Sequence, residues 1–372
     1  MICKLESLLK YEQPTKYIVA SEDYSDEFVT PVLTAGKSFI LGYTDEEHGV
    51  CKASINPVII YDDFTTESKF VDFDFKVKSS AMKILHKINK DDNLKYLYYV
   101  VSCLKYKPFS HKRTWISDFS KFQVKYRIPE EQNKIVSELD KIQDALANKN
   151  EQLKKLDKLI QSKFCEMFGD PVLNDKRWDK EPLKNITTKI GSGATPKGGN
   201  ESYKKDGVSL IRSMNVYNNY FNYKDLAYID DIQAEGLKNV VVLENDILLN
   251  ITGASVARSC IVPTNILPAR VNQHVAIVRI KDNFSNIFIS YQLTNITYQQ
   301  ELLTLSKGKG GTREALTKGQ LEELLVILPP LPLQQAFASF VEKVEKAKAI
   351  VNKEIAHLQE LLDSRMDFYF RK

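Results

Sequence analysis

Two long helix-forming segments, repeated at a fixed distance, constrain the fold of this chain more than any other feature. Residues 129–168 and 332–370 contain no internal Gly or Pro and are rich in Lys, Glu, Gln, Leu and Ala, which favour helices. The two segments align at a constant offset of 202 residues, so that Gln132 matches Gln334 and Phe168 matches Phe370. A similarity of this kind predicts an internal structural repeat.

Apolar residues in both segments recur at steps of four and three, the pattern of a coiled-coil seam. The expected seam residues are Ile135, Leu139, Ile142, Leu146, Leu153, Leu156, Ile160, Phe337, Val341, Val344, Val351, Ile355, Leu358 and Leu362. A helix of about 36 residues is roughly 54 Å long. We expect antiparallel packing that pairs Leu139 with Leu362, Ile142 with Leu358, Leu146 with Ile355 and Lys149 with Val351. Lys149 and Lys348 interrupt the stripe, and their stems can cover apolar neighbours while the ammonium groups reach water.

Globular segments alternate with the long helices. Both end on the same plan, in which a basic loop containing Thr precedes a short helix, a strand, a Pro and the long helix. Short apolar runs bounded by polar residues predict buried strands, and residues 94–104 and 286–297 are expected helices. The predicted fold is α+β, with two mixed α/β domains separated by two long antiparallel coiled-coil helices in a pseudo-twofold repeat. The expected boundaries are 1–128, 129–177, 178–328 and 329–372.

The composition excludes several classes of protein. With 43% apolar and 27% charged residues, the chain fits a folded protein rather than a disordered one. Its five Cys are dispersed and form no CxxC pair, so we expect neither a zinc site nor a disulfide framework, and a reducing cytoplasm fits best. No signal peptide and no apolar stretch of about 20 residues is evident, so no membrane span is expected.

Catalytic motifs are not evident, and we predict no catalytic residue and no metal site. The Gly-rich segment 191–199 does not match a phosphate-binding P-loop, and Pro196 within it opposes the helix that a P-loop requires. Asp62, Glu67 and Lys69 superficially resemble a metal-nuclease motif. Their spacing is too short for two neighbouring strands, and a turn with a solvated rim is the simpler interpretation.

Recognition of DNA is the remaining chemistry. The net charge is only +4, but residues 1–75 carry −8 and residues 76–128 carry +10. Lys and Arg attract phosphates irrespective of sequence, whereas Arg, Asn, Gln, Ser and Thr can also contact base edges. The candidate DNA-binding residues are Lys37, Tyr43, Thr65, Thr66, Lys69, Lys76, Lys78, Lys112, Arg113, Ser192, Thr195, Lys197, Arg212, Asn215, Tyr217, Arg258, Arg270, Asn272, Gln273, Lys307, Lys309 and Arg313.

With this plan of alternating domains and helices, the chain resembles the specificity subunit of type I restriction-modification systems. The stretches that carry the resemblance are 11–17, 30–36, 58–66, 191–196, 244–248 and the entries to the long helices at Gln132 and Gln334. The resemblance implies a non-catalytic subunit with two target-recognition domains, each of which reads half of a split DNA target. It also implies that the helices set the spacer between the halves.

The resemblance further implies the partners: double-stranded DNA, two methyltransferase subunits and restriction subunits that translocate DNA, with no membrane. It places S-adenosylmethionine, ATP and Mg²⁺ in the partner subunits, and no cofactor in this chain. One departure is that Asp62-Asp63-Phe64-Thr65 stands in the first domain where the second has Asn245-Asp246-Ile247-Leu248. The two domains are therefore expected to read unlike half-sites, which makes the target asymmetric.

Two alternatives remain open. The chain could be a stand-alone restriction or modification enzyme with a nuclease centre at Asp62, Glu67 and Lys69. It could also be a coiled-coil scaffold without any role in binding nucleic acid.

Overall fold

A computed structural model describes residues 1–34, 39–104, 106, 113–196, 198–307 and 314–371. The chain divides into two compact units, residues 1–151 together with 352–372, and residues 152–351. Each unit therefore contains one globular segment and a part of both long helices. Within the described ranges, we find no helix with the length and apolar character that crossing a membrane would need.

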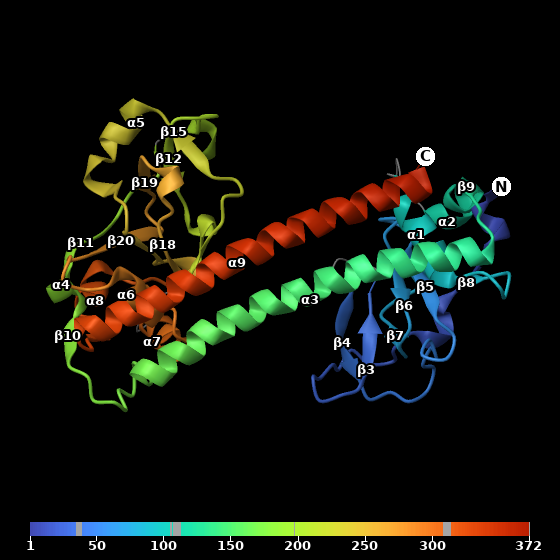
Figure 1. Cartoon of the computed structure of the whole chain (residues 1–372), viewed down its shortest axis with the longest axis horizontal. Helices are drawn as coiled ribbons and strands as arrows, with labels where there is room; N and C mark the ends of the chain where they lie inside the picture. The colour runs from blue at the N-terminus through green and yellow to red at the C-terminus, as the bar shows by residue number, and fades with distance from the viewer. Residues whose placement is uncertain (35–38, 105, 107–112, 197, 308–313, 372) are drawn as a thin grey trace. The chain divides into compact units, whose positions relative to one another are not determined.

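The two long helices are α3 (Pro129–Phe168) and α9 (Leu331–Met366), and a π-helical turn, Asp367–Arg371, follows α9. Pro129 opens α3, and Pro332 is the second residue of α9, where a missing backbone N–H costs nothing. The two predicted helices are thus confirmed (Figure 1). All of the expected seam residues are buried or half-buried.

The helices run antiparallel within each unit. In the first unit, Nζ of Lys149 lies 2.7 Å from Oε2 of Glu354, and Nε of Arg365 lies 2.9 Å from Oε1 of Glu138. Both partners lie three residues beyond the positions expected opposite them, a shift of less than one helical turn. Leu139 and Leu362 belong to one hydrophobic cluster, as expected.

The second unit contains the other polar interruption of the seam. Nζ of Lys348 on α9 lies 2.8 Å from Oδ1 of Asp157 on α3 and 2.8 Å from Oε1 of Glu345 on its own helix. Burial alone would lower the pKa of Lys348, but the hydrogen bonds to these two carboxylates raise it. Lys149 and Lys348 therefore each form an ion pair with the opposite helix, and their side chains remain 32% and 18% exposed.

Within the described residues, the globular part of the first unit contains a four-stranded sheet, a three-stranded sheet and a two-stranded pair of β1 with β9. The four-stranded sheet has the order β2-β8-β5-β6 and is antiparallel, and the three-stranded sheet has the order β4-β3-β7, in which β3 and β7 are parallel. The elements are β1 Ile2–Lys4, β2 Leu9–Glu12, β3 Thr30–Leu33, β4 Ile40–Thr44, β5 Val58–Asp62, β6 Ser68–Val71, β7 Lys76–Val77, β8 Met82–Lys87, α1 Leu94–Cys103, α2 Thr114–Ser117 and β9 Gln123–Lys125.

The second unit repeats this topology with one further strand, β16, at the edge of the second sheet. Its sheets have the orders β11-β20-β17-β18 and β15-β12-β19-β16, and β12 and β19 are again parallel. The elements are β10 Lys180–Pro182, α4 Leu183–Ile186, β11 Thr187–Ser192, β12 Val208–Ile211, β13 Val216–Tyr217, β14 Tyr220–Phe221, β15 Ala227–Ile229, α5 Asp231–Gly236, β16 Val241–Val242, β17 Ile247–Asn250, β18 Ser259–Ile261, β19 Ala269–Val271, β20 Val275–Ile280, α6 Asn286–Leu293, α7 Ile296–Ser306, α8 Lys318–Glu322 and β21 Leu325–Ile327.

The expected helix over 286–297 is in fact two helices, α6 and α7. The break lies at Asn295, whose side chain accepts a hydrogen bond from the N–H of Thr297 at 3.0 Å and so caps a new helix. An Asn inside an apolar stretch favours this N-cap over continuation of the helix.

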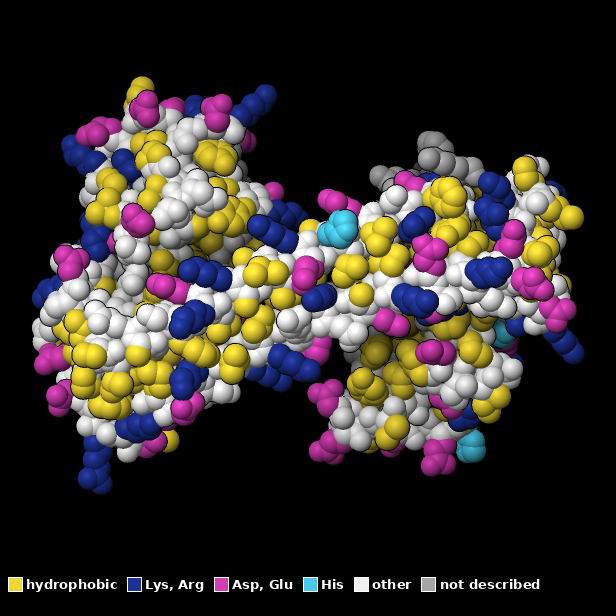
Figure 2. All heavy atoms as spheres, viewed as in Figure 1, with side chains coloured by type: hydrophobic (Ala, Val, Ile, Leu, Met, Phe, Trp, Pro, Cys, Tyr) yellow, Lys and Arg dark blue, Asp and Glu magenta, His cyan; other side chains and the backbone are white. Residues whose placement is uncertain are grey.

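Charges are mixed on the molecular surface. On the face drawn in Figure 2, Lys and Arg side chains alternate with Asp and Glu over both globular parts and both long helices. No large patch of one charge is evident on this face, so candidate DNA contacts there must be sought among particular side chains.

A buried glutamine connects each long helix to its own globular part. The side-chain oxygen of Gln132 accepts the N–H of Asn93 at 2.7 Å, and that of Gln334 accepts the N–H of Ser285 at 3.0 Å. Asn93 and Ser285 are the N-cap residues of α1 and α6. The offset of 202 residues seen in the sequence thus matches two residues with the same structural role.

We expect Gln334→Leu to lower the free energy of unfolding of the second unit by about 1–3 kcal/mol, because two buried backbone groups lose their partner. These groups are the N–H of Ser285 and the carbonyl of Pro329, which the amide contacts at 2.8 Å. Urea denaturation followed by Trp178 fluorescence measures the effect. Gln161→Leu, at an exposed position of α3, is the matched control, expected within about 0.5 kcal/mol of the parent. An unchanged unfolding midpoint for Gln334→Leu would contradict this role.

Candidate nucleic-acid interface

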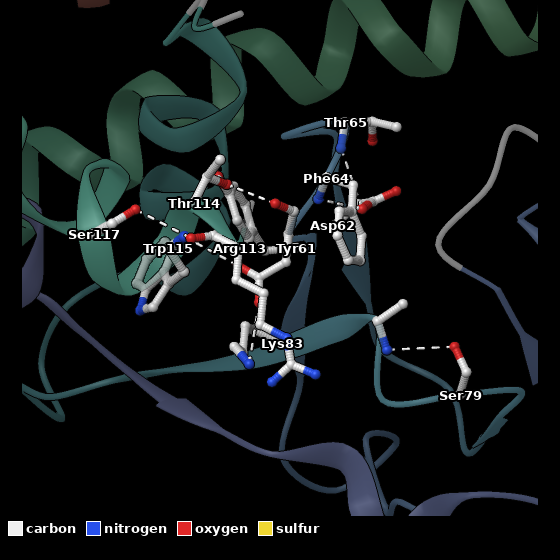
Figure 3. A network of polar contacts seen from close by, with 12 residues as sticks. Tyr61, Asp62, Phe64, Thr65, Ser79, Lys83, Arg113, Thr114, Trp115 and Ser117 are labelled. Atoms are coloured by element: carbon white, nitrogen blue, oxygen red, sulfur yellow. Dashed lines mark hydrogen bonds and ion pairs between the residues drawn. The ribbon is translucent and has the colours of Figure 1, made fainter. Parts of the chain in front are cut away.

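Asp62 builds the turn between β5 and β6. Its carboxylate is 4% exposed and accepts hydrogen bonds from the N–H groups of Phe64 at 2.8 Å and Thr65 at 3.2 Å (Figure 3). Such a side-chain contact reverses the chain locally. Thr65 is exposed, and the hydroxyl of Thr66 donates to the backbone carbonyl of Tyr106 at 2.9 Å. Two of the predicted DNA-binding residues therefore lie side by side on a fixed turn.

A buried network of polar contacts lies next to this turn on the interior side. The carboxylate of Asp63 lies 3.1 Å from the Nζ of Lys83, and both side chains are at most 1% exposed. The same carboxylate accepts the N–H of Trp115 at 3.0 Å, and the Asp63 carbonyl accepts the hydroxyl of Thr114 at 2.9 Å. The Tyr61 hydroxyl lies 2.8 Å from that of Thr114 (Figure 3), and burial raises the Tyr61 pKa well above its usual value. The network fixes the start of α2 against the end of β5.

Polar residues line a hollow of about 490 Å³ over the turn. Lys69, on β6, is exposed, and so is Arg113, which immediately precedes α2. The hollow is lined by Thr65, Thr66, Glu67, Ser68, Lys69, Ser102, Leu104 and Tyr106. The structure thus brings together Thr65, Thr66 and Lys69.

Of the suspected nuclease motif, Asp62 is buried in the turn, whereas Glu67 and Lys69 are exposed. The expectation that the spacing is too short for two neighbouring strands was wrong, because β5 and β6 pair directly as antiparallel neighbours. Asp62 forms the turn, and Asp63 forms the ion pair with Lys83. Among the residues that the structure describes, no group of three or more His, Cys, Asp or Glu is placed to hold a metal ion. The arrangement therefore gives no support to the alternative of a nuclease centre.

The corresponding turn of the second unit contains Asn250 in place of Asp62, since each of these residues ends the strand that leads into the turn. The match of Asp62 with Asn245 expected from the sequence was therefore wrong by five residues. The side-chain amide of Asn250 donates to the carbonyls of Ser213 at 2.9 Å and Val216 at 3.3 Å, which holds the segment leading to Tyr217. The guanidinium carbon of Arg258 lies 4.7 Å from the centre of the Tyr217 ring, within the range of a cation–π contact. A hollow of about 420 Å³ is lined by Ser213, Met214, Tyr217, Thr252, Gly253, Ala254, Ser255, Arg258 and His274.

A chain of hydrogen bonds extends from this hollow. The Thr252 hydroxyl lies 2.5 Å from Nδ1 of His274, and Nε2 of His274 lies 3.0 Å from the amide nitrogen of Gln273. Gln273 also forms a hydrogen bond with the hydroxyl of Thr195. Asn272 positions His274, since its side-chain oxygen accepts the N–H of His274 at 3.0 Å. Thr195, Gln273, Tyr217 and Arg258, all predicted DNA-binding residues, are thereby grouped at one region of the second unit.

In the Gly-rich segment 191–199, Gly193 is required by a close backbone contact. Its N–H donates to the carbonyl of Asn272 at 3.1 Å, and a Cβ at this position would lie 1.8 Å from the carbonyl oxygen of Val271. Only glycine permits this close backbone approach. The segment therefore packs on the strand β19 and brings Thr195 to Gln273.

Two predicted basic residues form ion pairs with acidic side chains, Lys76 in the interior and Lys78 at the surface. Lys76 is 3% exposed, and its Nζ lies 2.5 Å from Glu46 and 2.7 Å from the carbonyl of His48. Lys78 forms an ion pair with Glu22. The predicted contact of Lys76 with DNA does not agree with its position, because its ammonium group is buried against an acidic partner.

Other predicted residues have structural roles in the second unit. Asn215 is fully buried, donates to the carbonyl of Asn222 at 2.9 Å and accepts the N–H of Arg212 at 3.1 Å. A DNA contact of its side chain does not agree with this burial. The guanidinium of Arg212 donates to the carbonyl of Asp225, and that of Arg270 donates to two backbone carbonyls. Asn272 is 5% exposed and serves to position His274.

The remaining predicted residues are dispersed or not described. Tyr43 on β4 and Ser192 at the end of β11 are half-buried, and Lys307 is exposed just after α7. Five predicted residues lie outside the described ranges: Lys37, Lys112, Lys197, Lys309 and Arg313.

Several polar residues that line these hollows are not among the candidates from the sequence, and Glu67, Thr252 and Ser255 are examples. The signal that could have found them is the alignment of residues 62–68 with 250–259. Both segments follow a buried strand and end in a Ser that begins the next strand.

Comparison with known proteins agrees with this arrangement. Residues 175–360 match the family model described as the type I restriction modification DNA specificity domain. The chain is 30% identical over 381 residues to the type I restriction enzyme EcoR124I/EcoR124II specificity subunit of Escherichia coli, covering 98% of this chain and 91% of the relative.

Two solved structures share the fold. The crystal structure of a type I restriction-modification S subunit from M. genitalium has a TM-score of 0.59 at 15% identity, covering 98% of this chain and 94% of the other. A chain from a structure describing complex assembly and conformational transition of the type I R-M system has a TM-score of 0.55 at 17% identity, covering 99% and 96%. The identity to the E. coli subunit spans nearly the whole chain, and on that ground this chain belongs to the specificity subunits of type I restriction-modification systems.

Proposed function

We propose that each globular part reads one half of a split, asymmetric DNA target. The observation that carries this proposal is the repeated turn after the central strand, which presents a polar hollow in each unit. Side chains suited to base edges and phosphates line both hollows. The residues of the two hollows differ, which favours unlike half-sites.

We also propose that the paired helices set the spacer between the half-sites and carry the partner subunits, namely two methyltransferase subunits and restriction subunits that translocate DNA. The interhelical ion pairs Lys149–Glu354 and Lys348–Asp157 support a fixed register, which a ruler requires. The subunit itself is non-catalytic in this proposal. S-adenosylmethionine, ATP and Mg²⁺ then belong to the partner subunits.

Methylation mapping tests the proposal. A genome carrying this subunit with its methyltransferase is expected to acquire methylation at one split motif, with two unlike half-sites and a spacer of constant length. Methylation at a continuous motif, or none above the strain that lacks the subunit, would contradict it.

Two further measurements separate the alternatives. DNA cleavage by the pure chain in Mg²⁺ would favour an enzyme. A scaffold without a nucleic-acid role predicts no salt-dependent binding of the subunit–methyltransferase complex to duplex DNA, whereas phosphate contacts make such binding fall steeply with salt.

A further inference from the structure

The turns that precede β6 and β18 are structurally equivalent. In the ladders, Tyr61 pairs with Ser68, and Leu249 pairs with Ser259. The N–H of the next residue donates across the turn in both units, from Asp62 to the carbonyl of Glu67 and from Asn250 to that of Arg258, each at 2.8 Å.

Further details of the two turns agree. The backbone N–H of Thr66 donates to the carbonyl of Asp62 at 3.0 Å, and that of Ala257 donates to the carbonyl of Asn250 at 2.9 Å. Both residues have a positive φ, 63° and 69°, a conformation that is uncommon for residues other than glycine. Glu67 and Arg258 therefore occupy the same structural position, immediately before the second strand, with opposite charges.

Arg258 is arranged to present its guanidinium. The Tyr217 ring covers one face of the group at 4.7 Å, and no acidic residue lines its hollow. Among the described residues, Arg258 forms no ion pair. Stacking on an aromatic ring leaves the planar edge of a guanidinium free to donate two parallel hydrogen bonds, and the preferred base partner of that edge is the O6/N7 pair of guanine.

Glu67 offers the opposite chemistry. Its side chain is exposed, it forms no ion pair within the described ranges, and its N–H donates to the Thr65 hydroxyl at 3.3 Å. A carboxylate only accepts hydrogen bonds, so against a base it needs a donor, and the N4 amino group of cytosine is the usual one. Lys69, two residues away and exposed, supplies positive charge that reduces repulsion between the carboxylate and the phosphates.

We propose that Arg258 and Glu67 are equivalent base-reading residues, Arg258 contacting a guanine in one half-site and Glu67 a cytosine amino group in the other. This inference rests on the proposed function. One position of a repeated turn, with its charge inverted, then gives the two domains different specificities on the same scaffold.

Methylation mapping of two variants, each expressed with the methyltransferase, tests the assignment. In Arg258→Gln, methylation at the original motif falls by roughly tenfold and sites with adenine at one position become methylated, because Gln prefers adenine N6/N7. In Glu67→Gln, the same kind of change occurs at one cytosine position of the other half-site. Arg177→Gln and Glu47→Gln, at exposed positions of the second and first units, leave the motif unchanged.

The outcomes distinguish this inference from the proposed function. The base-reading assignment alone is overturned if the split motif persists unchanged in both variants. It is also overturned if both variants relax the same half-site. A parent protein that directs no split methylation overturns the proposed function. Thermal unfolding of the variants within the range of their controls ensures that a change in motif reports recognition rather than folding.

Discussion

Replacing Lys83 by Met is expected to lower the free energy of unfolding of the first unit by about 3–5 kcal/mol, because it leaves the Asp63 carboxylate buried without its cation. Both side chains of this pair are at most 1% exposed, and the two charged atoms lie 3.1 Å apart. Guanidinium denaturation followed by Trp115 fluorescence, in a Trp178→Phe background, measures the effect. The backbone N–H of Trp115 donates to the same carboxylate, so the Trp115 indole lies close to this pair and reports on the region.

A second substitution identifies the cause of the loss. Adding Asp63→Asn to Lys83→Met removes the buried charge but retains an oxygen for the N–H of Trp115, so most of the lost stability should return. Lys52→Met is the matched control, because the ion pair of Lys52 with Asp74 has a similar length, 2.9 Å, but its Lys side chain is 61% exposed. It is expected to cost at most about 1 kcal/mol. Equal losses for Lys83→Met and Lys52→Met would contradict a special role of the buried pair.

The long helices could be predicted from the sequence because their signal is local and repeated. The absence of Gly and Pro, and steps of four and three between apolar residues, predict a helix over about 129–168, in agreement with α3. The second helix, expected over about 332–370, runs as α9 from Leu331 to Met366 and continues as a π-helical turn. The ion pairs across the helices do not join the residues expected opposite each other. Lys149–Glu354 is offset by three residues and Lys348–Asp157 by about five, because long charged side chains reach along the helices. A seam pattern constrains which face of a helix is buried more strongly than its axial position.

The candidate site was predicted only in part, because the partner of a polar side chain is set by the fold. Lys76 has the composition of a phosphate contact, yet its partner Glu46 is 30 residues away in sequence and adjacent in space. Asn215 likewise has the chemistry of a base contact but is used to hold backbone carbonyls. Thr195, Gln273, Tyr217 and Arg258 were chosen separately by side-chain type, whereas their convergence depends on strands that are distant in sequence. Whether they contact DNA stays a prediction.

Inserting four residues after Asn148 is expected to change the spacer of the target and leave both half-sites as they are. Four residues rotate the rest of an α-helix by about 400° and so nearly restore the seam, while lengthening it by about 6 Å. That length is comparable to one or two base-pair steps of about 3.4 Å. Methylation mapping should therefore show loss of the original motif and gain of one whose spacer is one or two base pairs longer.

The matched comparisons for this insertion test the ruler itself. Asn148→Ala keeps the helix length at an exposed position and should leave the motif unchanged. A five-residue insertion adds a similar length but rotates the following residues by about 140° relative to the seam, which separates apolar residues of α3 from those of α9. It is expected to abolish methylation, because each half-site must meet its domain at one phase of a duplex turn of about 34–36 Å. If the four-residue insertion altered a half-site instead of the spacer, the helices would be contributing to base recognition, and their role as a ruler would have to be abandoned.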